Sequence, residues 1–287
     1  MPELSITTAD GHTLHAHADG DASPTLVLLH AGVCDARSWN GLVDELAPHR
    51  RVVRYDRRGY GAFAPSSGAF SHLDDLLAVL DAAAPDEPVW LVGSSLGGSL
   101  AINAALEHPE RVAGLVLFAP GITGQPWGGF DAMDPATRAL ALRAMNAAER
   151  GDLDEQVTAQ VELWLDGPAA PGRVVGPARD LATDMARIIA EGRTDEDAGS
   201  TGVTAWPRLS ELEMPVIVIW GTLDAPDELP GLRHMCATVQ NGRLIEFPGA
   251  AHLPYLEHPL ACAELILEAV HQPMPVARHR TPHPALS

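Results

Sequence analysis

A serine stands at the centre of a glycine-rich pentapeptide, Gly93-Ser94-Ser95-Leu96-Gly97. The pentapeptide follows an apolar run, Val89–Val92, and precedes small and apolar residues typical of a helix. A tight turn from a strand into a helix needs small residues on both sides of its central residue, and it lifts that side chain clear of the backbone. The pattern therefore predicts that Ser95 is a nucleophile and that the N–H of Leu96, at a helix start, stabilises an oxyanion. A serine that only caps the helix is the alternative.

A serine nucleophile needs a base and a group that orients the base, and two further apolar runs supply candidates. Asp224 follows Val216–Trp220, and His252 follows Arg243–Phe247. Both lie just past the carboxyl end of a predicted strand, where sites in open α/β sheets form. The chain order of serine, aspartate and histidine also fits a nucleophile on such a turn. We therefore expect His252 to be the base and Asp224 to orient it, with Asp227 as the less favoured acid.

The loop His30-Ala31-Gly32-Val33 follows another apolar run, Thr25–Leu29. A loop at this position can bring a second backbone N–H to the oxyanion. Gly32 is the expected donor and Val33 the alternative. We expect His30 to pack and to form hydrogen bonds within the loop rather than to act as a base.

Other chemistry is less well supported by the sequence. Gly59–Ala64 fits the pattern G-x-G-x-x-A, but Pro65–Gly68 follows it in place of a helix, so we expect no dinucleotide cofactor. A histidine-based metal site near His12 is not expected, because only His15 and His17 would share a face of an alternating strand. All 19 cationic side chains are arginines, which excludes mechanisms that use a lysine. We expect no cofactor and no metal.

The elements that must position these residues alternate between strands and helices. Predicted strands cover Thr25–Leu29, Val52–Tyr55, Val89–Val92, Leu115–Phe118, Val216–Trp220 and Arg243–Phe247, and predicted helices cover Trp39–Leu46, Leu73–Ala83, Gly97–His108 and Pro259–Val270. Most of the strands are continuously apolar, as in parallel sheets with helices on both faces. Leu4–His17 alternates around Ala9-Asp10-Gly11 and predicts a hairpin at the sheet edge. The predicted fold class is α/β, with a mostly parallel central sheet flanked by helices.

The alternation stops between Ile122 and Ala205. Three helical patterns replace it there, near Asp134–Arg150, Leu153–Leu165 and Ala178–Glu191. We therefore predict an α/β core over residues 1–121 and 206–270, an inserted helical cap over 122–205 and a loose tail over 271–287. An insertion that leaves the carboxyl edge of the sheet would cover the nucleophile. The candidates to line a substrate pocket beneath it are Val33, Trp127, Met145 and Trp164, although packing within the cap is the alternative role for the tryptophans.

The composition limits the partners of the chain. Its 287 residues carry 19 cationic and 38 acidic side chains, a formal net charge of 19 − 38 = −19. Such a charge repels phosphate backbones and anionic membranes, and no apolar run approaches the ~18 residues of a membrane span. The first 20 residues lack the pattern of a secretory signal, and the three cysteines are scattered. We expect a cytoplasmic protein with a small-molecule substrate, and the oligomeric state stays open.

Taken together, these segments resemble the α/β-hydrolase family, in its capped esterase, lactonase and peroxidase-like branch. The matching segments are His30-Ala31-Gly32, Asp56–Gly61, Gly93–Gly98, Gly221–Asp224 and His252 with Glu257 and Pro259. The resemblance implies an α/β-hydrolase fold in which Ser95, Asp224 and His252 are nucleophile, acid and base. It also implies that the backbone N–H groups of Gly32 and Leu96 hold the oxyanion.

Details of the match favour some activities over others. The R-G-x-G turn and the segment Trp164–Pro168 most resemble relatives of 3-oxoadipate enol-lactone hydrolase. Ala31 and Phe63 depart from the usual glycine and serine, and the loop after His30 lacks the form common in hydrolases of carbon–carbon bonds. A serine at position 95 argues against haloalkane dehalogenases and epoxide hydrolases, which carry an aspartate there.

We therefore expect a hydrolase of carboxylic esters, lactones or thioesters that forms an acyl-enzyme on Ser95. Two alternatives stay open. The first is a cofactor-free enzyme of another class with the same residues, such as a perhydrolase, a lyase or a carbon–carbon bond hydrolase, for example in secondary metabolism. The second is a binding protein of the same fold that has lost turnover.

Overall fold

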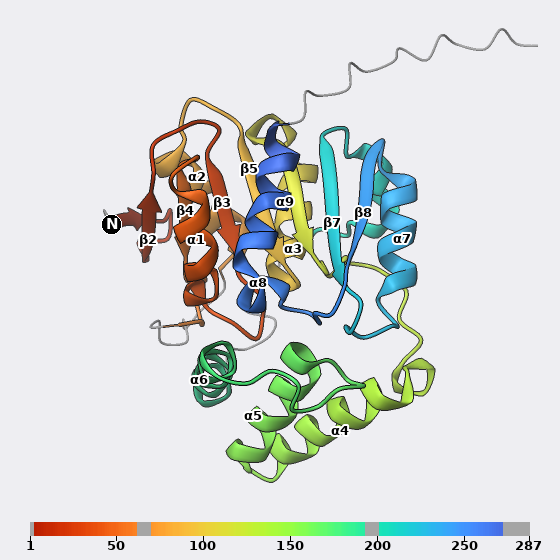
Figure 1. Cartoon of the computed structure of the whole chain (residues 1–287). Coiled ribbons are helices and arrows are strands. Elements are labelled where there is room, and N and C mark those ends of the chain that lie inside the picture. The colour runs from red at the N-terminus through yellow and green to blue at the C-terminus, as the bar shows by residue number, and fades with distance from the viewer. Residues whose placement is uncertain (1–2, 62–69, 193–200, 272–287) are drawn as a thin grey trace, which may run out of the picture.

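A mixed sheet of eight strands forms the centre of the computed structural model, which describes residues 3–61, 70–192 and 201–271. The strands lie in the order β1-β2-β4-β3-β5-β6-β7-β8 (Figure 1). Their bounds are β1 Glu3–Thr7, β2 Thr13–Asp19, β3 Leu26–Leu29, β4 Val52–Tyr55, β5 Val89–Ser94, β6 Val112–Phe118, β7 Pro215–Gly221 and β8 Asn241–Phe247. The β1–β2 hairpin is antiparallel and lies at one edge, where β2 pairs with β4, and the strands from β4 to β8 run parallel.

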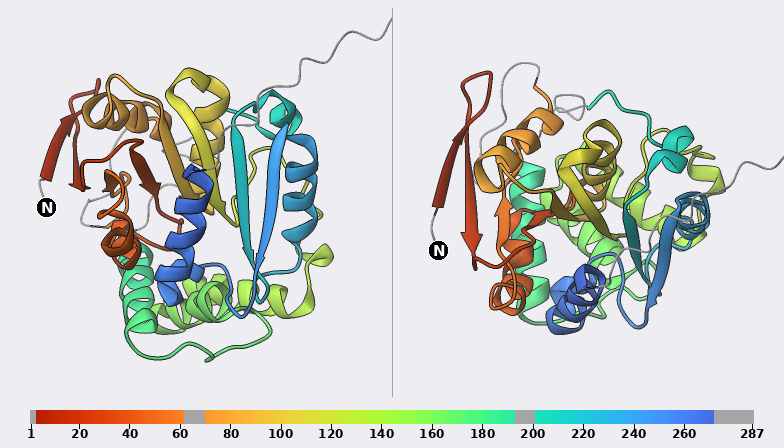
Figure 2. Two further views of the ribbon diagram at one scale, coloured as in Figure 1. Left: turned by 45° about the horizontal axis from the view of Figure 1, so that its top comes forward. Right: turned by 90° about the horizontal axis from the view of Figure 1, so that it is seen from above.

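Helices cover both faces of the sheet, which explains why its central strands are apolar throughout. Every residue of β3, β4 and β5 is buried. Helices α2 (His72–Ala83), α3 (Leu96–Glu107) and α7 (Leu229–Thr238) contribute to the core on one face. Helices α1 (Asn40–Leu46) and α9 (Pro259–His271) contribute to the core on the opposite face (Figure 2). Short helical turns join these elements, among them η1 (Ala36–Trp39), η2 (Pro109–Arg111), η5 (Trp206–Glu211) and α8 (Pro254–Glu257).

A helical insertion separates β6 from β7. It contains α4 (Pro135–Glu149), α5 (Leu153–Val161) and α6 (Pro177–Gly192), together with the turn η3 (Phe130–Ala132) and the π-helical turn η4 (Glu162–Asp166). Asp134 caps α4 by accepting hydrogen bonds from the N–H groups of Ala136 and Thr137, so the chain there follows a standard helix start. Figure 1 shows these helices together beyond one end of the sheet. Since β6 leads into the insertion, this end is the carboxyl edge of the parallel strands.

The predicted fold class is confirmed, including the edge hairpin and the helical insertion. Some details differ. Helix α7, which has Pro230 and Gly231 in its first turn, was not predicted. Strand β6 begins at Val112 and not at the predicted Leu115, and the helix predicted over Leu153–Leu165 changes into the π-helical turn η4 at Glu162. The bounds of the other predicted elements agree within two residues.

The division into core, cap and tail stays a prediction. The predicted tail beyond His271, the departure at Phe63 and the segment Pro65–Gly68 lie outside the described residues. Within the described ranges, no helix combines the length and apolar character that a membrane span requires.

Candidate active site

Ser95 is the single residue between β5, which ends at Ser94, and α3, which begins at Leu96. Its φ of 51° and ψ of −115° are unusual for a residue with a side chain, and such a conformation costs about 1–3 kcal/mol. Three backbone hydrogen bonds hold it. The Ser95 N–H donates to the Phe118 carbonyl (3.0 Å), and the Ser95 carbonyl accepts from the N–H groups of Ser99 (3.0 Å) and Gly121 (3.1 Å). The strained backbone conformation is therefore fixed by the end of β6, by Gly121 beyond it and by the first turn of α3.

The turn around Ser95 has no room for side chains at its two flanking glycines. A Cβ on Gly93 would lie 2.6 Å from the Gly97 carbonyl oxygen, and a Cβ on Gly97 would lie 2.1 Å from the carbonyl oxygen of Leu29. Both distances are far below van der Waals contact. The glycines of the pentapeptide thus permit helix α3 to start directly against strands β3 and β5.

Asp224 and His252 form a buried pair after β7 and β8. The Nδ1 atom of His252 lies 2.7 Å from Oδ2 of Asp224, and both residues are almost fully buried. The other carboxylate oxygen of Asp224 accepts the Ala225 N–H at 2.8 Å. Because a carboxylate can only accept, the pair assigns the proton to Nδ1 of the neutral imidazole. The lone pair of Nε2 then remains available, and this buried atom has no hydrogen-bond partner among the residues that the structure describes.

Burial and two acidic neighbours determine the protonation of His252. Burial lowers its pKa, but the Asp224 carboxylate and Glu228 together raise it more, so the pKa lies above the ordinary value of 6.5. Glu228 lies in the turn before α7. Burial raises the pKa of Glu228 itself to about 7. Sequence reasoning missed Glu228, because a single glutamate at a helix start has no pattern that marks it.

The loop after β3 lies beside the nucleophile turn. A Cβ on Gly32 would be 2.5 Å from Cδ1 of Leu96, so the backbone of Gly32 packs directly on Leu96. Leu96 is the first residue of α3, and its N–H therefore has no acceptor within the helix. Val33, the alternative donor, is partly exposed. Gly32 and Leu96, whose N–H groups are the expected oxyanion donors, are thus neighbours at the start of α3.

His30 anchors this loop and is not free to act as a base. Its Nδ1 donates to the carbonyl of Ala31 at 2.8 Å, and its Nε2 accepts the N–H of Arg57 at 3.2 Å. The side chain is fully buried, and burial lowers its pKa well below 6.5. The expectation that His30 packs within the loop is confirmed. The Asp56 carboxylate supports the same loop by accepting the Ala36 N–H at 2.7 Å.

The segment after His252 crosses the sheet edge toward Ser95. The Tyr255 ring packs on the Phe118 ring at 5.2 Å and stacks on Trp39 at 4.1 Å. Phe118 is the residue whose carbonyl binds the Ser95 N–H. No hydrogen bond joins the Ser95 hydroxyl to His252, since Nε2 of His252 has no partner. Catalytic hydrogen bonds commonly form only when substrate is bound, so this geometry is compatible with a nucleophile and its base.

The other predicted residues have different surroundings. Asp227 accepts the Asp134 N–H with both carboxylate oxygens (2.8 and 2.9 Å), so it joins α4 to the core and does not pair with His252. The Trp164 ring packs against the His252 ring at 4.6 Å. Trp127 and Met145 are 70% and 46% exposed. Of these three candidate pocket residues, the structure thus brings Trp164 to the Asp224–His252 pair.

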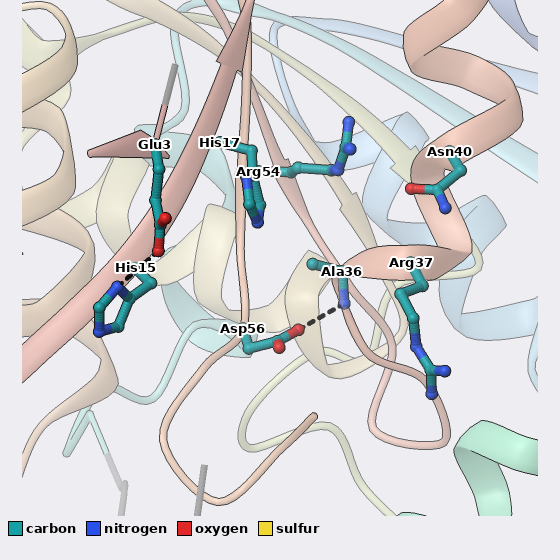
Figure 3. A pocket seen from close by; sticks show the side chains of 8 residues that line it. All are labelled: Glu3, His15, His17, Ala36, Arg37, Asn40, Arg54 and Asp56. Carbon is teal, nitrogen blue, oxygen red and sulfur yellow. Dashed lines mark hydrogen bonds and ion pairs between the residues drawn. The ribbon is translucent and has the colours of Figure 1, made fainter. Parts of the chain in front are cut away.

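A separate hollow of about 570 Å³ lies at the hairpin edge of the sheet (Figure 3). Its lining residues are Glu3, His15, His17, Ala36, Arg37, Asn40, Arg54 and Asp56. None of them is Ser95, Asp224 or His252, and an ion pair between His15 and Glu3 crosses part of it. Across the described residues, no three histidine, cysteine or acidic side chains form a group that could hold a metal ion.

Comparisons with known proteins agree on one family. The sequence model of the alpha/beta hydrolase family matches residues 26–265. A pimeloyl-[acyl-carrier protein] methyl ester esterase of Yersinia enterocolitica is 30% identical over 264 residues, which cover 88% of this chain and 95% of that protein. The structure of a Pseudomonas aeruginosa hydrolase superimposes with a TM-score of 0.72 at 25% identity, covering 94% and 98% of the two chains. An enol-lactonase from Burkholderia xenovorans LB400 shares the fold, with a TM-score of 0.69 at 20% identity, covering 94% of this chain and 100% of that chain.

Proposed function

The chain belongs to the alpha/beta hydrolase family, and we propose that it is a serine hydrolase that cleaves an ester, lactone or thioester bond of a small carboxylic-acid derivative. One observation carries the proposal. His252 donates Nδ1–H to the buried Asp224 carboxylate and keeps a buried, unpartnered Nε2, at the sheet edge where Ser95 stands in a strained turn. This is the arrangement that a base needs to remove a proton from a serine hydroxyl.

The reaction proceeds in two acyl-transfer steps. Nε2 of His252 takes the hydroxyl proton as Oγ of Ser95 attacks the substrate carbonyl, and Asp224 stabilises the imidazolium that forms. The N–H groups of Leu96 and Gly32 stabilise the oxyanion. The intermediate collapses, the alcohol or thiol leaves with the proton from His252, and an acyl-Ser95 ester remains. His252 then deprotonates a water molecule, which attacks this ester. His252 returns that proton to Oγ of Ser95 as the acid is released, so that the free enzyme is restored.

The charges of the insertion and of the whole chain favour a free small molecule as the substrate. The named relatives act on a methyl ester of a pimeloyl group that is bound to an acyl-carrier protein. In this chain, five cap arginines are held in ion pairs with acids of the protein itself: Arg138, Arg143, Arg173, Arg179 and Arg187. Those charges are compensated within the protein, and the whole chain carries a net charge of −19. Both features disfavour electrostatic attraction of an anionic carrier.

A fluorophosphonate and a substrate panel test the proposal. The reagent should label Ser95, as found by peptide mass analysis, and Ser95→Ala should lower kcat by about 10⁴-fold or more while the fold is retained. The panel should include p-nitrophenyl esters, lactones and free methyl esters of dicarboxylic acids. Near-normal turnover by Ser95→Ala, or labelling of another residue, would refute the mechanism.

A further inference from the structure

One short segment of the insertion contacts the loops of both Asp224 and His252. The carbonyl of Trp164, in η4, accepts the His252 N–H at 3.2 Å, and the two rings pack at 4.6 Å. Just after η4, a Cβ on Gly167 would lie 2.1 Å from the Leu223 carbonyl oxygen and 3.2 Å from Cβ of Ala251. Gly167 has a φ of 91°, which glycine adopts without strain. The insertion therefore contacts Leu223, the residue before Asp224, and Ala251, the residue before His252.

Asp166 fixes the shape of this segment. Its side chain is fully buried, and its carboxylate accepts the N–H groups of Gly172 (2.6 Å) and Val174 (2.9 Å). The Arg179 guanidinium, from α6, neutralises the carboxylate at 2.8 Å. A buried charge with these partners closes the loop 167–173 into a defined conformation. The loop in turn determines where Arg173 can reach.

Arg173 links this segment to the core on both sides of His252. Within the insertion, its Nε donates to the Asp166 carbonyl (3.0 Å) and its Nη2 to the Leu165 carbonyl (2.9 Å). Across the interface, Nη1 donates to the Gly249 carbonyl (3.1 Å) and to Oε2 of Glu257 (2.6 Å), and Nη2 donates to Oε1 of Glu257 (2.9 Å). The pair with Glu257 is bidentate, and the Arg173 and Glu257 side chains are only 24% and 9% exposed. Such a pair is strong and directional.

We propose that Arg173 is a positioning residue of the reaction, which holds the loop from Gly249 to Glu257 so that the His252 imidazole stays aligned with Asp224. The inference rests on the proposed serine hydrolase mechanism. Asp224 and His252 stand on two different loops, so their 2.7 Å contact depends on how those loops are held together. Arg173 binds the His252 loop three residues before the histidine and five residues after it. The insertion thereby contributes to kcat as well as to substrate binding.

The test compares three variants, with Ser95→Ala as the check on the underlying mechanism. Arg173→Met removes the guanidinium and keeps an apolar stem. Glu257→Gln removes the charge and keeps one acceptor oxygen. Arg143→Met is the matched control, because Arg143 makes a similar bidentate pair with Glu155 between α4 and α5 and an ion pair with Glu162 of η4. Among the described residues, its ion pairs do not reach the loop from Gly249 to Glu257. Circular dichroism and thermal scans fix an assay temperature at which each variant is folded.

Misplacement of a catalytic group by about 1 Å costs about 10²-fold in rate. We therefore expect Arg173→Met to lower kcat by about 10- to 10²-fold with KM changed less than about threefold, and Glu257→Gln to show a smaller loss of the same kind. The rate of phosphonate labelling should fall in parallel, since labelling needs His252 but no bound acyl group. Arg143→Met should stay within about twofold of the parent in both assays.

The outcomes separate the two claims. The positioning role would be overturned if Arg173→Met showed normal kcat and labelling, or if Arg143→Met lost as much activity as Arg173→Met. The serine hydrolase mechanism would still stand in that case, provided that Ser95→Ala is inactive. An active Ser95→Ala enzyme would refute the proposed function itself. If Arg173→Met does not fold, Glu257→Gln decides, because normal kcat and labelling in that variant would overturn the role.

Discussion

The proposed nucleophile and the proposed base of this protein are held in place by different physical means. Ser95 is fixed by backbone hydrogen bonds to Phe118 at the end of β6, to Gly121 beyond it and to Ser99 in α3, and by glycines that leave no space for a Cβ. His252 is fixed by side-chain charges, from Asp224 in the core and, through its loop, from Arg173 in the insertion. One half of the site therefore depends on shape within the core, and the other half depends on electrostatic contacts between two parts of the chain.

The difference has a consequence for tolerance to substitution. A close-packed turn cannot yield gradually, since a single added methyl group meets backbone atoms on several sides. A charged contact can be weakened in steps, by removing a charge, a donor or an acceptor. The nucleophile side should thus respond sharply to added volume, and the base side should respond in a graded way to lost charge.

The largest effect is expected at the acid. Asp224→Asn should lower kcat by about 10³–10⁴-fold, because an amide no longer favours the imidazole tautomer that leaves Nε2 unprotonated. Asp227→Asn is the matched control, since the Asp227 carboxylate accepts the Asp134 N–H and does not pair with His252, and this variant should lose less than about tenfold. Steady-state kinetics with a p-nitrophenyl ester measure both. If Asp227→Asn lost most of its kcat and Asp224→Asn lost little, the acid that orients His252 would be Asp227.

A substitution at Gly97 tests whether close packing fixes the turn around Ser95. In Gly97→Ala the new Cβ would lie 2.1 Å from the Leu29 oxygen and 2.6 Å from the His30 oxygen, so the start of α3 must move together with Ser95. We expect a loss of about 10²-fold in kcat and about 1–3 kcal/mol in the free energy of unfolding. Kinetics and denaturant unfolding measure the two losses.

Gly192, at the end of α6, provides the control for this prediction. A Cβ there meets no atom of the described residues within 4 Å, so Gly192→Ala should keep full activity and gain up to about 1 kcal/mol in the free energy of unfolding. Full activity in Gly97→Ala would show that the turn around Ser95 yields to added volume. The proposed contrast between the two halves of the site would then fail.

The same contrast explains which features the sequence could predict. The strands follow from continuous apolar runs, and Ser95, Asp224 and His252 follow from their places after those runs, because such signals are local. Helix α7 lacked a clear signal, since Pro230 and Gly231 lie in its first turns. The contacts of Arg173 were beyond prediction, because they join residues 76 and 84 positions apart and depend on how the insertion sits on the core.

The charges around His252 also predict how kcat/KM depends on pH. His252 must be neutral to accept the Ser95 proton. Burial lowers its pKa, but the Asp224 carboxylate and Glu228 together raise the pKa above 6.5. The kcat/KM should therefore fall about tenfold per pH unit on the acid side, with a midpoint above 6.5. Because the pKa is raised on folding, the contribution of His252 to the stability of the fold is present below pH 6.5 and is lost as the pH rises through the folded value.

Glu228→Gln sharpens this test. The variant removes a negative charge near His252 and also removes a group whose own pKa is about 7. We expect the acid limb to move to lower pH, in a profile measured from about pH 5 to about pH 9. An acid limb centred well below 6.5 in the parent enzyme would contradict the arrangement of His252 and Asp224 as the working pair.

The smallest effects are expected where the insertion does not touch the base. Trp127 and Met145 are 70% and 46% exposed, and each should contribute only to how a substrate is covered. Trp127→Ala and Met145→Ala should change KM by about a few-fold and leave the labelling rate of Ser95 unchanged, because labelling reports the nucleophile and base alone. Arg173→Met should show the reverse, a lower labelling rate with little change in KM. If labelling fell equally in all three variants, the whole insertion would act as one support for the catalytic residues, and the distinction between its covering and positioning parts would be lost.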